Sequence, residues 1–251
     1  MMHLRWILTN LIMNEIFLSV VIPTFNEQKR IVQTLDQLLV YFSLQHYTWE
    51  IVISDDGSTD NTVILVEQWS QKHPNIHLLL LPHKGKGWAV KNGMLNSNGI
   101  YRLMFDADMS MDPGQIENFL IRIQQNCDVV IGSRNLNESV KQDEPLLRKL
   151  MGRLFNLFVQ MFAVKGYLDT QCGYKCFTSQ SAEKLFEMQK IWGWGFDVEI
   201  LMLCKQINLH VEEMPISWHH QLDSKVRVFS STFSIIKEVL LTRIRILSKK
   251  Y

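Results

Sequence analysis

Short apolar segments alternate with helical patterns between residues 17 and 131, and this alternation constrains the fold more than any other feature. Each apolar segment is continuous, which is typical of strands that helices cover on both faces. Strands that alternate with helices indicate a mostly parallel sheet. The strands are expected at Phe17–Ile22, Trp49–Ser54, Ile76–Leu81, Tyr101–Phe105 and Asp128–Ile131.

Helical patterns follow these strands and continue after them. In the first pattern, Glu27–Phe42, apolar residues recur at three- and four-residue steps and so share one face. Further helices are expected at residues 61–71, 88–94 and 196–205. We therefore predict an α/β fold with one Rossmann-like domain, residues 1–227. A basic amphipathic helix, residues 228–251, is expected to follow it.

The 251 residues are 47% apolar and 20% charged, which suffices for one globular core. The formal net charge of +1 hides an asymmetry, because residues 225–251 carry +6 and the remainder carries −5. A basic segment on an acidic body favours an anionic surface as a partner. A solvated helix end would carry the same charges, so the charge leaves both interpretations open.

Cysteine usage and hydropathy favour a cytoplasmic protein. The apolar run Trp6–Met13 lies between Arg5 and Glu15 and is too short to span a bilayer, so we expect no transmembrane helix. No Cys-x-x-Cys pair occurs, so the four cysteines are interpreted as reduced structural thiols. They are Cys127, Cys172, Cys176 and Cys204.

Polar clusters follow four of the expected strands, at the point where each strand ends. In open parallel sheets, ligands bind beyond the carboxyl ends of the strands. We therefore expect four separate segments to meet in one crevice. The segments are Pro23–Glu27, Asp55–Asp60, Lys84–Gly87 and Asp106–Asp108.

Asp106 and Asp108 are candidate metal ligands and catalytic residues. Residues two apart on an extended segment point the same way, so both carboxylates can face one cation. Oxygen ligands suit Mg²⁺ or Mn²⁺, which stabilise the charge on a departing nucleoside diphosphate. An Asp-x-Asp sequence alone is weak evidence and more often caps a loop, but its place after an apolar strand favours the metal.

The segment Asp55–Asp60 joins a strand to a helix, and Ser58, Thr59 or Asp60 can cap that helix. Capping does not explain two adjacent carboxylates, whose repulsion is costly. A nucleoside would supply donors for Asp55 and Asp56. Both interpretations can hold, for different residues of the segment.

Lys84–Gly87 precedes a helix, with glycines that permit close approach of a ligand and lysines that suit a diphosphate. The spacing of a Walker loop is absent. No Gly-x-Gly-x-x-Gly follows the first strand, which argues against a dinucleotide oxidoreductase and disfavours nucleotidyl transfer.

Together these segments, with Val20–Glu27 at the first strand, resemble glycosyltransferase family 2, whose members are inverting enzymes with the GT-A fold. The resemblance spans about residues 17–227. It implies that Asp55 and Glu27 contact the nucleoside and that Asp106 and Asp108 hold the diphosphate and the metal. The donor-binding set that we infer is Pro23, Asn26, Glu27, Asp55, Asp56, Gly57, Ser58, Lys84, Gly85, Lys86, Gly87 and Asp106.

The second half resembles the dolichyl-phosphate β-glucosyltransferases within that family more than the related mannosyltransferases. The resemblance implies UDP-glucose as donor and a polyprenyl or dolichyl phosphate as acceptor. It also implies a cationic acceptor pocket of Arg134, Lys175, Ser224 and Lys225. The residues that carry it are Gly132–Arg134, Asp169–Lys175, Trp194–Glu199 and Ser224–Val226.

This sequence departs from that group at two places. The eukaryotic enzymes carry a membrane-spanning N-terminal segment, which we do not expect here. Met109 and Ser110 follow the metal motif, so a third protein ligand for the metal is not assigned. A mannosyl donor such as GDP-mannose and a non-catalytic binding protein stay as alternatives. We expect no nucleic acid partner, and the oligomeric state is left open.

The acceptor class depends on Asp197. A phosphate monoester is largely dianionic near neutral pH and needs guiding cations rather than a general base. A sugar hydroxyl would need a base, and Asp197 is the candidate by position in the family. Asp197 can instead be a structural carboxylate at the start of the helix, where negative charge is favourable.

Two apolar stripes flanked by basic residues suggest contact with a membrane surface. Such helices can lie in the interface of an anionic membrane, which would reach a lipid-borne phosphate. Packing on the domain or on another subunit would explain the stripes equally well. The first is Phe229, Phe233, Ile236, Leu240, Ile244 and Leu247, and the second is Leu147, Leu150, Met151, Leu154, Phe155, Phe158, Val159 and Phe162.

Overall fold

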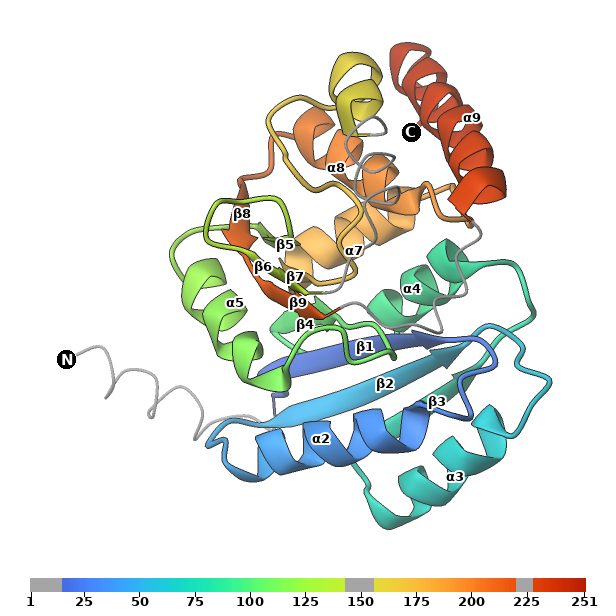
Figure 1. Ribbon diagram of the computed structural model, residues 1–251, viewed down its shortest axis with the longest axis vertical. Coiled ribbons are helices and arrows are strands. Elements are labelled where there is room, and N and C mark those ends of the chain that lie inside the picture. Colours follow the sequence, from blue (N-terminus) through green and yellow to red (C-terminus); the bar gives the residue numbers. More distant parts are fainter. Residues whose placement is uncertain (1–14, 143–155, 220–227) are drawn as a thin grey trace.

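The computed structural model describes residues 15–142, 156–219 and 228–251 (Figure 1). Its centre is a seven-stranded sheet of order β3-β2-β1-β4-β7-β5-β8. The strands are β1 Leu18–Thr24, β2 Trp49–Asp55, β3 Ile76–Leu80, β4 Tyr101–Met104, β5 Val129–Ser133, β7 Lys175–Thr178 and β8 Val211–Pro215. Two further strands, β6 Val140–Gln142 and β9 Ser217–His219, form a parallel pair of their own.

Helices cover both faces of the sheet, as the sequence predicts. On one face, α2 Ile31–Ser43, α3 Thr62–Lys72 and α5 Ile116–Ile123 share a core with Val20, Ile22 and Leu103. On the other face, α4 Lys86–Leu95, α7 Ser179–Met188 and α8 Phe196–Gln206 share a core with Val21 and Met104. The alternating side chains of the central strands thus divide between two apolar layers, which makes a three-layer α/β fold.

The strand β7 gives the sheet its mixed character. It runs antiparallel to both β4 and β5, while the other pairings in the large sheet are parallel. Since its direction is reversed, its first residue, Lys175, lies level with Met104 near the carboxyl end of β4. This strand was not predicted from the sequence. Its reversal places the residues before Lys175 at the edge of the sheet where the polar clusters meet.

The structure corrects the ends of several predicted elements. Helix α2 begins at Ile31 rather than Glu27, because Asn26 has a φ of 57° and the chain turns there. The N–H groups of Arg30 and Ile31 both bond to the Glu27 carbonyl, which closes this turn. Strand β3 is an edge strand with half-exposed residues, so it is not covered on both faces. A short helix, η1 Pro113–Gln115, was not predicted.

The C-terminal helix α9 spans Val228–Leu247 and packs against α8. Its inner face buries Ile235, Val239 and Thr242, and the first two join the core around α7 and α8. Most described members of the predicted stripe lie on the opposite face, where Leu240, Ile244 and Leu247 are exposed. The side chains of Phe229 and Phe233, and residues 147–155 of the other stripe, lie outside the described part.

No helix within residues 15–142, 156–219 and 228–251 combines the length and the apolar character needed to cross a bilayer. The four cysteines, all within these ranges, are free and buried.

Candidate active site

The predicted polar clusters meet at the carboxyl ends of β1–β4. The sheet order changes direction between β1 and β4, which is where open α/β sheets form a crevice for ligands. Pro23 lies within β1 beside Ser54 of β2, so the segments after these two strands leave the sheet together. The structure therefore brings the four predicted segments together.

Asp55 is buried at the end of β2, and other parts of the chain saturate its carboxylate. Ser58 donates to it through its backbone N–H (2.7 Å) and its hydroxyl (2.6 Å). The Thr24 hydroxyl donates from the neighbouring strand at 2.9 Å. These bonds tie the end of β1 to the turn after β2. Asp55 thus shapes the turn that follows β2.

Asp56 holds the Lys84–Gly87 loop. Its carboxylate accepts the backbone N–H groups of Lys84 (2.9 Å) and Gly85 (2.8 Å), and it lies 2.8 Å from Nδ1 of His83. The sequence offers a nucleoside as the source of donors for the adjacent carboxylates Asp55 and Asp56. In the structure, groups of the protein itself donate to both carboxylates.

Asn26, Glu27 and Gly57 complete the turns at this edge. The Asn26 side chain accepts the Thr59 N–H at 2.8 Å, and Glu27 pairs with Arg30 at 2.7 Å. Gly57 has a φ of +76° and lies so close to the His83 backbone that a side chain would be strained there. Asp60 accepts the first N–H of α3, that of Thr62, at 2.9 Å, as predicted, although the N-cap residue is Asn61.

The glycines of the 84–87 loop allow close contact with another segment of the chain. An added Cβ at Gly85 would lie 2.6 Å from the Trp192 carbonyl oxygen, and one at Gly87 would lie 2.7 Å from that of Ile191. The Lys84 ammonium lies 4.0 Å from the Trp88 ring and 4.7 Å from the Trp192 ring. Residues 191–193 therefore brace the loop from the side.

Asp106 follows β4 after Phe105 and pairs with the Lys86 ammonium at 2.6 Å. Burial lowers the pKa of Lys86, but the Asp106 and Asp197 carboxylates outweigh it and raise that pKa. Gly173 also lies against the Asp106 carboxylate, because a Cβ added at Gly173 would lie 1.8 Å from Asp106 Oδ2. Only glycine leaves room there for the carboxylate, a constraint that the sequence did not reveal.

Asp108 is the second carboxylate of the pair. Burial raises its pKa and the Asp106 charge raises it further, against hydrogen bonds from Ser110. Ser110 donates its N–H (3.0 Å) and its hydroxyl (2.7 Å) to one Asp108 oxygen. Met109, between these residues, has a φ of 54°, a strained conformation of the kind that gathers at functional sites.

The pair fits a divalent cation. Two carboxylates that repel one another in a partly desolvated site gain stability from a cation between them, and their oxygen atoms suit Mg²⁺ or Mn²⁺. Within the described ranges, no group of three or more histidine, cysteine or acidic side chains forms a ligand cluster.

Lys175 and Asp197 form a buried ion pair at 2.5 Å. Lys175 also donates to the Cys172 carbonyl oxygen. Burial raises the pKa of Asp197, and the charges of Lys175 and Lys86 offset only part of that effect. Lys175 and Asp197 therefore neutralise one another beside the Asp106–Lys86 pair.

Arg134 binds Asp169 through two hydrogen bonds, at 2.6 and 2.9 Å, and its backbone N–H donates to the same carboxylate. Its guanidinium lies 5.4 Å from the Trp218 ring. Two other members of the predicted acceptor pocket, Ser224 and Lys225, lie outside the described residues. The structure thus places Arg134 at the end of β5, paired with a buried carboxylate.

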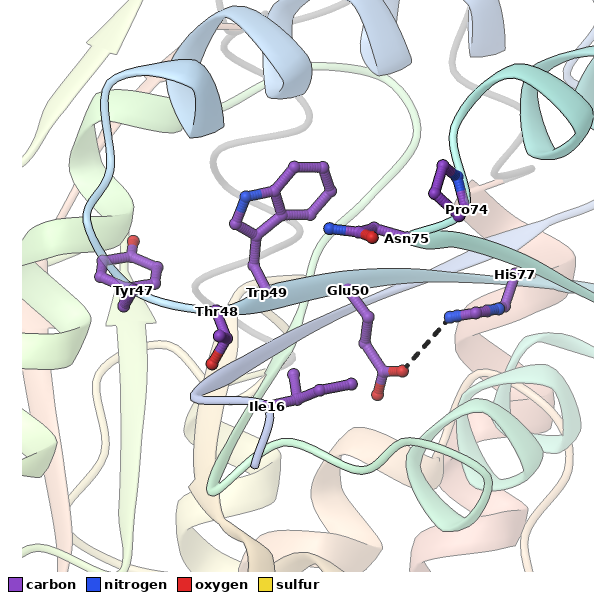
Figure 2. A pocket seen from close by; sticks show the side chains of 8 residues that line it. All are labelled: Ile16, Tyr47, Thr48, Trp49, Glu50, Pro74, Asn75 and His77. Carbon is purple, nitrogen blue, oxygen red and sulfur yellow. Dashed lines mark ion pairs between the residues drawn. The ribbon is translucent and has the colours of Figure 1, made fainter. Parts of the chain in front are cut away.

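A hollow lies at the opposite edge of the sheet, at the amino ends of β1–β3 (Figure 2). Its volume is about 460 Å³, and Trp49, Glu50 and His77 are among the residues that line it. Glu50 is buried, accepts the Ser19 hydroxyl and the Asn98 N–H at 2.6 Å each, and lies 3.5 Å from His77. These contacts satisfy Glu50 and join β1, β2 and the start of β4, so we interpret it as structural.

Comparison with known protein families shows to which family this chain belongs. The profile of glycosyl transferase family 2 matches residues 19–186, which include all four clusters. The chain belongs to glycosyltransferase family 2. It is 38% identical over 248 residues to a dolichyl-phosphate β-glucosyltransferase of Dictyostelium discoideum, covering 93% of this chain and 76% of the relative. The enzyme of the same name from Saccharomyces cerevisiae is 34% identical, covering 91% and 75%.

Solved structures of similar fold support the GT-A architecture of this glycosyltransferase. Glucosyl-3-phosphoglycerate synthase from Mycobacterium tuberculosis, solved with Mn²⁺, UDP and glucosyl-3-phosphoglycerate, superposes with a TM-score of 0.69. The alignment covers 92% of this chain and 80% of that one, at 15% sequence identity. At this identity the likeness concerns the fold, and the predicted GT-A fold is confirmed.

Proposed function

We propose that this family 2 glycosyltransferase moves glucose from UDP-glucose to a dolichyl or polyprenyl phosphate, with inversion and with a divalent cation. The observation that carries the proposal is the pair Asp106 and Asp108 at the carboxyl end of β4, facing the Lys86 ammonium. The relatives named above are dolichyl-phosphate β-glucosyltransferases, which favours this donor and this acceptor. A related fold binds UDP-glucose with Mn²⁺.

Asp106 and Asp108 would hold Mg²⁺ or Mn²⁺, which stabilises negative charge on the departing diphosphate. Lys86 lies within hydrogen-bonding distance of Asp106, so it supplies a second positive charge at the same place. Lys84 adds a charge held by two indole rings. The Asp56 carboxylate fixes the backbone between these lysines, so both charges are positioned before the donor arrives.

The ion pair of Lys175 with Asp197 favours a phosphate acceptor over a hydroxyl. A general base needs an accessible carboxylate, whereas Asp197 is buried and bonded to an ammonium group. A phosphate acceptor brings its own charge and needs cations for guidance. Arg134, at the same edge and partly exposed, is a cation that such a phosphate can meet.

A membrane surface is the partner that we infer for the exposed apolar residues of α9. These residues adjoin a helical segment at residues 156–162, because Arg243 donates to the Phe162 carbonyl at 2.6 Å. We call the exposed apolar side chains of both helices the outer apolar surface. It consists of Leu157, Met161, Phe162, Leu240, Leu241, Ile244 and Leu247.

Release of UDP from UDP-glucose, with a polyprenyl phosphate and Mn²⁺ present, tests the activity. We expect turnover by the purified chain, loss of turnover with a chelator, and recovery when Mn²⁺ is restored.

Asp106→Asn and Asp108→Asn should each lower kcat by roughly 100-fold or more, because each removes a charge that stabilises the transition state. Asp112→Asn is the matched control, since Asp112 is an exposed carboxylate nearby that caps η1. Full turnover by both site variants would refute the proposal.

A further inference from the structure

The donor side of the site depends on a segment far away in sequence. Residues 191–195 lie against the 84–87 loop, where the backbone N–H of Trp88 donates to the Trp192 carbonyl oxygen at 3.2 Å. Lys86 lies 5.3 Å from the Trp194 ring. The segment is rich in glycine, with Gly193 and Gly195 flanking Trp194, so its backbone has many conformations to lose when it is ordered.

Two carboxylates hold this segment from behind. Glu199 of α8 accepts the N–H groups of Lys190 at 3.0 Å and Ile191 at 2.8 Å. Glu238 of α9 accepts the Gly195 N–H at 2.8 Å. The first carboxylate comes from the helix that continues the segment. The second comes from the C-terminal helix, 43 residues further along the chain.

The fit around Glu238 is close. An added Cβ at Gly193 would lie 2.5 Å from Glu238 Oε1, and one at Gly195 would lie 2.6 Å from Oε2. Both glycines therefore let one carboxylate rest against the backbone on either side of Trp194. Val239, the next residue of α9, is buried in the core shared with α7 and α8.

We propose that Glu238 is a positioning residue of the donor site. By accepting the Gly195 N–H, it fixes residues 191–195 against the 84–87 loop, and so it holds Lys84 and Lys86 where a diphosphate binds. The helix that carries the outer apolar surface thereby completes the nucleotide site. The inference rests on the proposed function for its ligand, a uridine diphosphate with a divalent cation.

A comparison of Glu238→Ala with Glu238→Gln tests the proposal in the full chain. Glutamine retains a side-chain oxygen that can accept the Gly195 N–H, whereas alanine does not. Calorimetric binding of UDP with Mn²⁺ should weaken about tenfold in Glu238→Ala and stay within about twofold of wild type in Glu238→Gln. In turnover, KM for UDP-glucose should rise with little change in kcat. Equal loss in both variants would mean that the charge matters rather than the position, and would overturn the proposal.

Two controls separate positioning from general destabilisation. Ser234→Ala changes an exposed residue one turn earlier on α9 and should leave UDP affinity unchanged. Val239→Ala leaves a cavity beside Glu238 and should lower Tm while UDP affinity stays near wild type. If UDP affinity falls as far in Val239→Ala as in Glu238→Ala, Glu238 has no specific role and the inference fails.

Amide hydrogen exchange of the nucleotide-free chain distinguishes failure of this inference from failure of the proposed function. Glu238→Ala should speed exchange in residues 190–195 and also in residues 84–88, whereas Glu238→Gln should not. Unchanged exchange at 84–88 would overturn the inference, whatever the nucleotide. A wild-type chain that binds no nucleotide, but shows the predicted exchange, would refute the donor assignment and retain the positioning role.

Discussion

Acidic and basic side chains lie next to one another in this site. Lys86 contacts Asp106 and Lys175 contacts Asp197, whereas the Asp108 carboxylate accepts hydrogen bonds from the hydroxyl and the backbone N–H of Ser110. Buried charges are tolerated when they are paired, and the removal of one partner is costly. Asp108 therefore gains most from an added cation, which agrees with the direction of its pKa shift.

Asp197→Asn separates the two acceptor classes. With a polyprenyl phosphate as acceptor, we expect kcat to fall by less than about tenfold, because the phosphate is already an anionic nucleophile. A general base would contribute roughly 10²- to 10⁴-fold. The measurement is kcat at saturating donor, together with Tm, because asparagine leaves the Lys175 charge without its partner.

The matched control is Glu50→Gln, which neutralises a carboxylate that is equally buried at the opposite edge of the sheet (Figure 2). It should lower Tm without a specific effect on turnover. A loss of 100-fold or more in Asp197→Asn, at a Tm no lower than that of Glu50→Gln, would instead support a hydroxyl acceptor.

Among the elements, the reversed strand β7 has the largest consequence for the site. The segment that leads into it carries Asp169, which pairs with Arg134 at the end of β5. Burial would raise the pKa of Asp169, but the charge and hydrogen bonds of Arg134 lower it to about 2. The ion pair thus joins the two segments on either side of the predicted acceptor pocket.

This shift predicts an acid-sensitive contribution to stability. The pKa of Asp169 lies below its unfolded value of 3.8, so the contribution is present above about pH 4 and is lost as the pH falls towards 2. We expect about 2 kcal/mol from it. Arg134→Ala should lower the free energy of unfolding at pH 7 by about 3 kcal/mol, because it leaves a buried carboxylate without its partner. Urea denaturation between pH 2.5 and pH 7 measures both effects.

Arg122→Ala is the control for that measurement, because Arg122 forms an exposed pair with Glu212 at 2.7 Å. An exposed pair contributes about 0.5 kcal/mol or less. Equal effects of the two arginine variants, or no change in acid sensitivity on loss of Arg134, would contradict the assigned role of the buried pair.

The elements also show which features were predictable from the sequence. The five predicted strands are present because continuous apolar runs of β-branched residues, such as Val20–Ile22, leave little alternative in a covered sheet. The strands β6, β7 and β8 were not predicted. Strand β7 is short and begins with a charged residue, Lys175, whose burial depends on its ion pair with Asp197. No local pattern reports a contact of that kind.

In the site, too, some residues were predictable from the sequence and others were not. Asp106, Asp108 and the 84–87 loop were predictable, because each follows a strand and carries its own chemistry. Gly173, Trp192 and Glu238 were not assigned roles, since their importance lies in close approach to residues from other segments. The glycines around Trp194 are the one local signal that could have indicated a tightly packed backbone there.

At the scale of the whole molecule, the outer apolar surface lies at the end away from α2 and α3. In Figure 1, α9 and the helical segment at residues 156–162 lie at one end of the molecule, with α2 and α3 at the other. Exposed arginine and lysine side chains, Arg243 and Lys249 among them, accompany the outer apolar surface. Apolar side chains interspersed with basic ones favour contact with an anionic membrane over full exposure to water.

Flotation with anionic liposomes tests this surface with point variants, since removal of residues 228–251 would also remove the buried Val239 and the Glu238 contact. Ile244 is 61% exposed and Leu247 is 74% exposed. Ile244→Gln with Leu247→Gln should weaken binding by roughly tenfold or more, because each side chain forfeits about 1.5 kcal/mol of apolar burial. Ile64→Gln on α3, at 53% exposure, is the matched control and should float like wild type. Binding should also weaken as salt rises, since the basic side chains are exposed. Equal flotation of the α9 variant and the α3 control would exclude this surface as the membrane contact and leave a second protein chain as its partner.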